Sequence, residues 1–272
     1  EFNALNCSFA KANLEAQEYL KPMFRADAVK ACREELEKQV DLRFYGTPIA
    51  MDDLDDLRAL LGYDKINLRG GSYGSRAALT YIQRHPEHVR RVALISLAPF
   101  SFKNPLYHSR SAEEALDKLF AACDDQPGCR DAFPKLREEF SSVLERLKAS
   151  SVEVNVHHPE TGKPAKVLMG RPEFAEALRV MTYRRDAASM VPLAIHQAYL
   201  GNFTPFGELA VASNYGLRAM LRFGMLLCVT CSEDVARITE EDIVRETKGT
   251  YLGDDRVRQQ KNACKEWPES SL

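Results

Sequence analysis

The stretch 70–74, with the sequence GGSYG, constrains the fold of this chain more than any other feature. Before it, residues 66–68 form a short strand-like run, and residues 50–61 carry apolar side chains at helical spacing. After it, residues 76–84 have helical spacing, and residues 89–97 form an apolar, β-branched run typical of a buried parallel strand. The order helix, strand, glycine-rich turn, helix, strand predicts a βαβ unit with a parallel sheet and a right-handed crossover.

This stretch fits the pattern G-x-S-x-G, with Gly70, Ser72 and Gly74 at the fixed positions. The pattern alone has little specificity, because it arises by chance in roughly one chain in ten of this length. Its place between a strand and a helix is that of a nucleophile elbow, and it predicts that Ser72 is a nucleophile. We expect Gly70 and Gly74 to let strand and helix approach closely. The backbone N–H of Tyr73 is the expected oxyanion donor, beside the positive end of the helix.

The alternative is an ordinary glycine-rich turn between strand and helix, or one that binds phosphate. Phosphate-binding turns have a lysine followed by serine or threonine after the glycines, or the spacing G-x-G-x-x-G. Neither pattern occurs at residues 70–74, so the nucleophile elbow is the favoured interpretation.

From about residue 103 to residue 262 helical patterns dominate, and the runs 152–156 and 165–169 predict a hairpin. We expect three parts. Residues 1–102 form a partial α/β core that carries the elbow, residues 103–262 a mainly helical cap, and residues 263–272 the start of the return to the core. Helices are expected at residues 26–40, 112–123, 134–149, 172–181, 187–200 and 238–247.

Composition is that of a globular protein and excludes some partners. The 272 residues are 45% hydrophobic and 28% charged, with a formal net charge of -2, and the sequence pI is about 6.4. Without a basic surplus, neither nucleic acid nor a membrane surface is an expected partner. The longest apolar runs, 92–100 and 224–229, are much shorter than the roughly 20 residues that span a bilayer. We expect a small neutral or peptidic substrate and no cofactor, and the sequence does not indicate an oligomeric state.

The first ten residues lack the order of basic, apolar and small residues that marks a signal peptide, and the chain does not begin with Met. We therefore expect the N-terminus to be an internal cut. The dipeptide Glu1-Phe2 is alternatively a remnant of cloning.

Seven cysteines are many for a cytosolic chain of this size. Several connectivities are open, and the best local case is the segment 123–129, where a Pro-Gly turn can bring its two ends together. A disulfide set favours an oxidising compartment, and the alternative is that several cysteines are free and buried. The placement of the cysteines suggests the pairs Cys7 with Cys32, Cys123 with Cys129, and Cys231 with Cys264.

The residues around the elbow resemble a known family. The run 51–94, MDDLDDLRALLGYDKINLRGGSYGSRAALTYIQRHPEHVRRVAL, is similar to the tripeptidyl aminopeptidase and proline iminopeptidase family of α/β-hydrolases, which are serine peptidases. Residues 5–7 resemble a Leu-x-Cys segment of that family, and residues 123–129 resemble a paired-cysteine turn of its cap. Residues 224–234 and 264–268 are similar to its segments that lead back from cap to core. The resemblance implies a partial α/β-hydrolase core with a parallel sheet and a large, mainly helical cap insertion.

The same resemblance implies a serine hydrolase that releases residues from peptide N-termini, with Ser72 attacking the carbonyl. In the family the triad acid and base follow the Cys-x-x-Trp-Pro segment, here residues 264–268, so we expect them beyond Leu272 and outside this chain. The strand and loop that supply the second oxyanion donor are expected before Glu1. Glu233 is a candidate for binding a substrate ammonium group, with an N-cap role for a nearby helix as the alternative.

Two other functions stay open at this stage. One is an esterase or amidase acting on a small molecule, because the cap rather than the elbow determines the substrate. The other is a catalytically inactive fragment.

Position 226 is leucine where the family often has histidine, which puts any role of that side chain in doubt. The cysteines favour a secreted or periplasmic location.

No histidine of this chain is expected to act as the base. His85 and His88 lie at the far end of the elbow helix, roughly 15 Å from Ser72 by helix rise. We therefore expect negligible hydrolytic turnover from this polypeptide alone. The remaining histidines are expected at the surface or within the cap: His108, His157, His158 and His196.

Two patterns look like metal ligands but have simpler explanations, so no metal is expected. Cys228 and Cys231 form a C-x-x-C without a matching second pair, and we interpret them as one buried thiol and one half of a disulfide. The acidic run 52–56 carries Leu54 and Leu57 at helical spacing, which indicates a solvated helix face.

Overall fold

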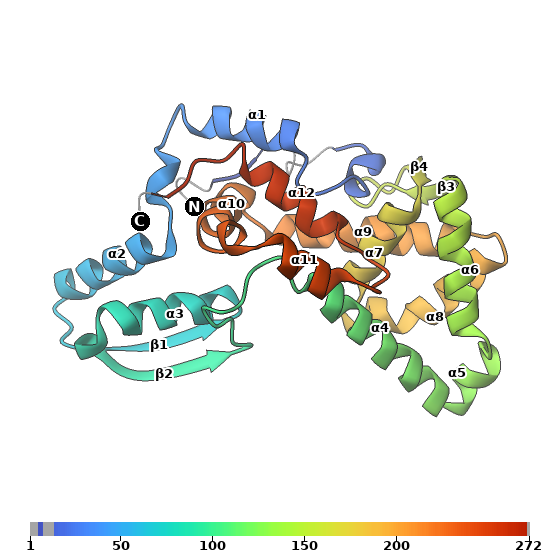
Figure 1. Ribbon diagram of the computed structural model, residues 1–272, viewed down its shortest axis with the longest axis horizontal. Helices are drawn as coiled ribbons and strands as arrows, with labels where there is room; N and C mark the ends of the chain where they lie inside the picture. Colours follow the sequence, from blue (N-terminus) through green and yellow to red (C-terminus); the bar gives the residue numbers. More distant parts are fainter. Residues whose placement is uncertain (1–4, 8–13, 271–272) are drawn as a thin grey trace.

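The computed structural model describes residues 5–7 and 14–270. Most of the first ten residues, and Leu272, lie outside this part, so the predictions about the chain ends are not addressed by it. The described residues form a small α/β unit on one side and a larger assembly of helices with one hairpin on the other (Figure 1).

The α/β unit has the predicted order of elements. Strands β1 (Ile66–Gly71) and β2 (Val89–Ile95) pair in parallel, with Gly70 opposite Leu94. Helix α3 (Tyr73–Arg84) connects them through the short turn η4 (Pro86–His88). Helix α2 (Thr47–Leu60) precedes β1, and Figure 1 shows α3 lying along the strands with α2 beside it. The prediction of a βαβ unit is confirmed.

The sheet of this unit is exposed, which corrects the expectation of a buried strand at residues 89–97. Val92 is 39% exposed and Ile95 is 50% exposed. Two apolar positions of α2 also face solvent, with Leu57 48% and Leu60 83% exposed. Among the described residues only these two strands form the sheet. Parallel sheets normally have both faces covered, so this unit leaves uncovered a surface of the kind that is usually buried.

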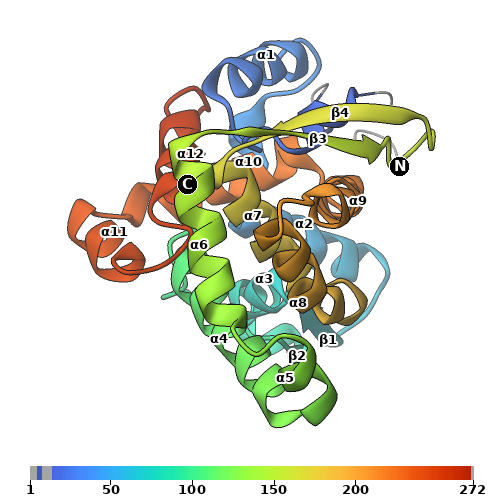
Figure 2. The same cartoon turned by 90° about the vertical axis from the view of Figure 1, so that its right-hand side faces the viewer.

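The helical assembly is larger and well packed. Strands β3 (Val152–His157) and β4 (Pro164–Met169) pair antiparallel, which confirms the predicted hairpin. Its core includes Phe174 and Phe206, both fully buried, whose rings stack with centroids 3.9 Å apart. In Figure 2 the hairpin lies across one end of the helices. The helices are α4 (His108–Asp125), α5 (Pro127–Ala132), α6 (Leu136–Ala149), α7 (Arg171–Met181), α8 (Arg185–Tyr199), α9 (Thr204–Met220), α10 (Phe223–Glu233), α11 (Glu240–Thr247) and α12 (Asp255–Cys264).

The N-terminal residues pack with the last helices of the chain. Helix α1 (Ala26–Leu36) contributes Val29 and Cys32 to a buried cluster that also contains Phe223 of α10 and Trp267. Figure 1 shows α1 beside α10 and α12. Residues from both ends of the described chain therefore form one core, which lies apart from the two-stranded sheet. The division at residues 102 and 262 stays a prediction.

The cysteines pair as predicted. Disulfides join Cys7 to Cys32, Cys123 to Cys129, and Cys231 to Cys264. Cys228 is a free, buried thiol, and its burial raises the pKa of the thiol to about 11. The interpretation of the C-x-x-C as one thiol and one disulfide half is therefore confirmed. No helix in residues 5–7 and 14–270 combines the length and apolarity needed to cross a bilayer.

Candidate active site

Ser72 occupies the turn between β1 and α3 in a rare backbone conformation. Its φ is 53° and its ψ is -123°, outside the regions that residues with a side chain normally adopt. The backbone N–H of Ser72 donates to the carbonyl oxygen of Ile95 at the end of β2, at 3.0 Å. The residue is exposed at the tip of the turn. Strain held in place by neighbouring structure is typical of functional residues, and this geometry is that expected of a nucleophile elbow.

The two glycines of the pattern have different roles. A Cβ atom at Gly70 would lie 2.1 Å from the carbonyl oxygen of Gly74, so Gly70 allows strand and helix to approach. A Cβ atom at Gly74 would have nothing within 4 Å. The expectation that both positions exclude side chains is therefore right for Gly70 and wrong for Gly74. The physical reason is that Gly74 contributes its backbone to the contact, while its own Cα faces open space.

Ser75 was not singled out from the sequence, yet it holds the elbow in place. Its side chain is completely buried. The hydroxyl donates to the carbonyl oxygen of Ser72 at 2.6 Å and accepts from the N–H of Ala98 at 2.8 Å. One hydroxyl thus joins the elbow to the segment that follows β2. A serine at the third position of a helix, where it can bond to the residue before the helix, was the available signal.

Tyr73 is linked to the helical assembly through its side chain. As the first residue of α3, it has a backbone N–H that no carbonyl within the helix can accept. Its phenol lies 2.9 Å from the hydroxyl of Thr47, and that hydroxyl lies 2.9 Å from a carboxylate oxygen of Glu233. Because the carboxylate can only accept, Thr47 donates to Glu233 and Tyr73 donates to Thr47. Burial, together with the charge of Glu233, raises the pKa of the Tyr73 phenol.

Glu233 also accepts from the backbone N–H of Thr47 at 2.7 Å. Its carboxylate therefore caps the first turn of α2, where the partial positive charge of the helix end favours an anion. The nearby helix α11 is capped instead by Thr239, whose hydroxyl accepts from the N–H of Asp242. The capping role thus concerns a helix that lies far from Glu233 in the sequence, and it had no sequence signal.

A second connection joins the elbow helix to the helical assembly. Arg76 of α3 donates to the carboxylate of Asp234 at 2.7 Å and to the carbonyl oxygen of Phe102 at 2.6 Å. Asp234 is only 2% exposed, and Arg237 also donates to it, at 3.1 Å. Burial raises the pKa of the Asp234 carboxyl, and the charges of the two arginines oppose this effect. A buried charge pair of this kind fixes position, because breaking it leaves an uncompensated charge.

Ser72 opens onto a pocket of about 280 Å³ between the elbow and α10. One wall is apolar and includes Leu226. The peptidase family that the sequence resembles often has histidine at this position. Arg76 and Asp234 line its polar part. The other lining residues are Tyr73, Ala98, Phe102, Asn104, Met220, Leu221, Arg222, Met225, Val229 and Thr230.

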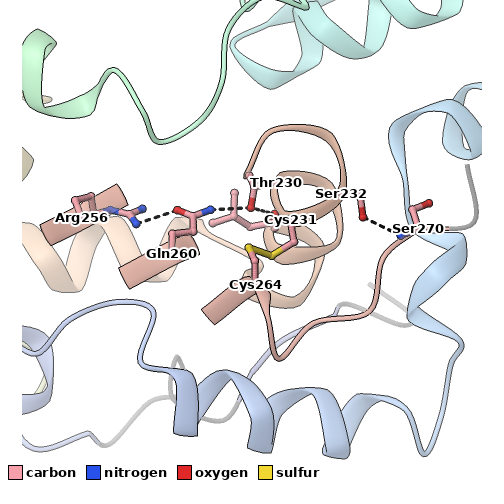
Figure 3. Close-up of a disulfide and its surroundings, with 8 residues drawn as sticks. Thr230, Cys231, Ser232, Arg256, Gln260, Cys264 and Ser270 are labelled. Carbon is pink, nitrogen blue, oxygen red and sulfur yellow. Dashed lines mark hydrogen bonds between the residues drawn. A yellow bond between two sulfur atoms is a disulfide. The ribbon is translucent and has the colours of Figure 1, made fainter. Parts of the chain in front are cut away.

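The wall formed by α10 is braced from behind by α12. Gln260 of α12 donates to the hydroxyl of Thr230 at 2.8 Å and accepts from Arg256 at 2.9 Å, as Figure 3 shows. The Cys231–Cys264 disulfide joins the same two helices. The pocket wall is therefore cross-linked by both covalent and hydrogen bonds.

None of the described histidines lines this pocket. His85 follows α3, whose 12 residues separate it from Ser72 by roughly 18 Å. His108 is the first residue of α4, and burial together with Arg179 and Arg256 lowers its pKa well below the usual value. His88, like His85, lies at the far end of α3 and contacts Asp55. The remaining three make contacts elsewhere: His157 with Glu208, His158 with the carbonyl oxygen of Leu14, and His196 with Glu139.

Comparison with known proteins agrees with this geometry. Residues 41–150 match the sequence family described as alpha/beta hydrolase fold. The elbow region has an alpha/beta-hydrolase fold. The proteins named Serine protease Hip1 of Mycobacterium bovis and Mycobacterium tuberculosis are each 29% identical to this chain over 143 residues, which is 51% of this chain and 26% of the relative. The match thus spans about a quarter of the length of these relatives.

Proposed function

We propose that this chain is the nucleophile-bearing part of a serine peptidase that releases residues from peptide N-termini. The observation that supports it most is the strained, exposed Ser72 at the edge of a 280 Å³ pocket. In the proposed reaction the Oγ of Ser72 attacks the substrate carbonyl, and the N–H of Tyr73 stabilises the oxyanion. The apolar wall formed by α10 accommodates the substrate side chain.

The proposed reaction needs a base to take the proton of Ser72. Since none of the described histidines lines the pocket, we assign the acid and base to polypeptide outside residues 1–272. The exposed surface of the β1–β2 sheet supports this assignment, because Val92 and Ile95 are the kind of residues that a parallel sheet buries under further elements. Additional strands next to β1 or β2 would bring the missing groups to the end of the sheet where Ser72 lies.

Glu233 is the proposed binding group for the substrate ammonium. Its two carboxylate oxygens each accept one bond from Thr47, which leaves further lone pairs available. The residue is half-buried, and a charge-assisted bond there is stronger than in water. The three disulfides favour the proposed secreted or periplasmic location.

Paired substrates test the function in the product of the complete gene. Aminoacyl p-nitroanilides with a free amino group should be cleaved, and the N-acetylated forms should not. Ser72→Ala should abolish the activity, on the order of a millionfold by comparison with other serine enzymes. Glu233→Gln should raise KM for the free-amine substrate much more than KM for an uncharged ester, because only the former has an ammonium group. Equal cleavage of acetylated and free substrates would exclude an aminopeptidase and favour the small-molecule esterase or amidase.

The 1–272 chain is the matched control. It should have no detectable turnover of p-nitrophenyl acetate above that of its Ser72→Ala variant. Rapid turnover that disappears in Ser72→Ala would show that the base lies within these residues. Absence of turnover by the complete gene product would favour the alternative that the protein is catalytically inactive.

A further inference from the structure

Three side chains that bind metals in other proteins meet at the far end of the elbow helix. Asp55 of α2 lies 2.7 Å from the Nδ1 of His88 and 3.6 Å from the Nδ1 of His85. One potential ligand atom from each residue lies within 4.8 Å of the other two. Asp55 was expected on a solvated helix face, and its side chain is instead only 13% exposed. The prediction of a solvated face is therefore wrong for Asp55, because α2 packs on α3 through this position.

His85 lies between two carboxylates, those of Asp52 and Asp55. Its Nε2 lies 2.9 Å from a carboxylate oxygen of Asp52, which can only accept, so Nε2 carries the hydrogen. On the other side of the ring, Nδ1 faces a carboxylate oxygen of Asp55 at 3.6 Å. This separation is longer than a hydrogen bond and is wide enough for one metal ion that binds both atoms at about 2.0–2.2 Å. The pairing of a histidine nitrogen with a carboxylate is also the outer contact that orients metal-binding imidazoles.

The other neighbours hold Asp55 in place. Tyr81 donates to Asp55 at 2.7 Å, and Arg58 donates to it at 2.8 Å. Nearby carboxylates outnumber the cations: Asp52, Asp55 and Glu87 against Arg58 and Arg84. The cluster thus carries a net negative charge around two imidazoles.

We propose that Asp55, His85 and His88 bind one divalent transition-metal ion. Two imidazole nitrogens and one carboxylate oxygen form a ligand set that suits Zn²⁺ and leaves a position for water. His85 binds through Nδ1 without a change of tautomer. His88 binds through Nδ1 after its proton moves to Nε2. The guanidinium of Arg58, 3.5 Å from Nε2, then turns aside so that the carboxylate of Glu87, 3.8 Å away, accepts from it.

The ion would act as a clamp between α2 and the end of α3. Asp55 belongs to α2, His85 follows the last residue of α3, and His88 ends the turn that leads into β2. One bound ion would therefore fix the α/β unit at the end opposite to Ser72. The site lies roughly 18 Å from the nucleophile by helix rise, so its role is structural.

Zn²⁺ titration of the purified 1–272 chain, followed by calorimetry and thermal unfolding, tests the proposal. We expect one equivalent of Zn²⁺ to bind and the melting temperature to rise by several degrees at saturation, because binding to the folded state stabilises it. His85→Gln and His88→Gln should each weaken binding by about tenfold or more. Mg²⁺, which prefers oxygen ligands, should not replace Zn²⁺.

Two variants serve as controls. His157→Gln alters an exposed histidine that is likewise paired with a carboxylate, at 2.7 Å from Glu208, and should leave Zn²⁺ binding unchanged. Cys228→Ser removes the free thiol and should also have no effect. If the histidine variants fold poorly, the absorption spectrum of the unmodified chain loaded with Co²⁺ distinguishes the ligands. Nitrogen and oxygen ligands give no thiolate charge-transfer band, so the proposed site predicts a spectrum without this band. Absence of saturable binding, a thiolate band, or equal affinity in His85→Gln/His88→Gln would overturn the proposal.

Discussion

The α/β unit and the helical assembly bury their apolar residues to very different extents. In the helical assembly Phe174, Phe206 and Ile195 are completely buried. In the α/β unit Ile95 is half exposed and Leu60 is 83% exposed, although both belong to regular elements. Helices with one apolar face can close a core among themselves, whereas a parallel sheet needs layers on both faces.

This contrast explains why the nucleophile depends on contacts made by the helical assembly. Two connections join the regions near Ser72: Glu233 with Thr47, and Asp234 with Arg76. Both acidic residues end or follow α10, the helix that forms the pocket wall. The helical assembly, which is the better-packed region, therefore positions α2 and α3 of the α/β unit.

Truncation of one apolar residue in each region gives the largest expected difference. Phe174→Ala should lower the free energy of unfolding by about 3–5 kcal/mol, because it opens a cavity beside Phe206. Ile95→Ala should lower it by less than about 1 kcal/mol, because half of that side chain is already in water. Urea unfolding of the two variants measures both values. A cost for Ile95→Ala similar to that for Phe174→Ala would show that the sheet is covered in solution, and the contrast would then fail.

The two elbow glycines give the next largest effect within the α/β unit. Gly70→Ala should cost about 3 kcal/mol, since the new Cβ atom would meet backbone at 2.1 Å and backbone cannot rotate away. Gly74→Ala is the matched control, because its Cβ atom would have nothing within 4 Å. It should leave stability unchanged or raise it by up to about 1 kcal/mol through better helix propensity. Equal destabilisation by both substitutions in thermal unfolding would contradict the assignment of the close contact to Gly70.

The smallest effect concerns an ion pair between the segment that connects β2 to α4 and helix α11, Lys103 with Asp242 at 2.6 Å. Hydrogen bonds from Lys103 and then Arg245 hold the pKa of the Asp242 carboxyl well below its usual range. A carboxyl with a lowered folded-state pKa stabilises the protein above its unfolded pKa, near 3.9, and this contribution disappears as pH falls further. In Asp242→Asn the free energy of unfolding should therefore fall less steeply with pH below about pH 4. At neutral pH the substitution should lower the free energy of unfolding by about 1 kcal/mol or less.

Urea unfolding at a series of pH values measures this slope. Asp117→Asn is the control, because Asp117 forms an exposed pair with Arg137 and should leave the acid slope unchanged. An unchanged slope in Asp242→Asn would mean that this ion pair does not stabilise the contact between the connecting segment and α11.

Much of the fold could be predicted because short sequence patterns indicate many of its elements. The elbow, the hairpin, the Cys123–Cys129 disulfide and several cap helices each have a signal within a few residues. Helix α10 was missed because it is buried on most sides, so its apolar residues show no helical spacing. Helix α12 was missed for the opposite reason, since it is mostly polar. At residues 127–128 a Pro-Gly turn was expected, but proline is favoured at the first position of a helix and Pro127 begins α5.

The site was predictable only where the chemistry is local. Ser72 and Gly70 followed from the pattern and its context. The contacts of Glu233 with Thr47 and of Arg76 with Asp234 join residues more than 150 positions apart. Neither pair has a spacing that a single sequence could reveal, because tertiary folding alone brings them together.

The chain of contacts from Glu233 through Thr47 to Tyr73 has a consequence for protein engineering. Exchange of helical segments between related proteins is a common way to change specificity, and it treats the catalytic turn as an independent module. Here an imported segment without a carboxylate at position 233 would leave the start of α2 uncapped. It would also remove the acceptor that orients the Thr47 hydroxyl toward the Tyr73 phenol. Positions 47, 73 and 233 therefore need to be transferred together in any such chimera.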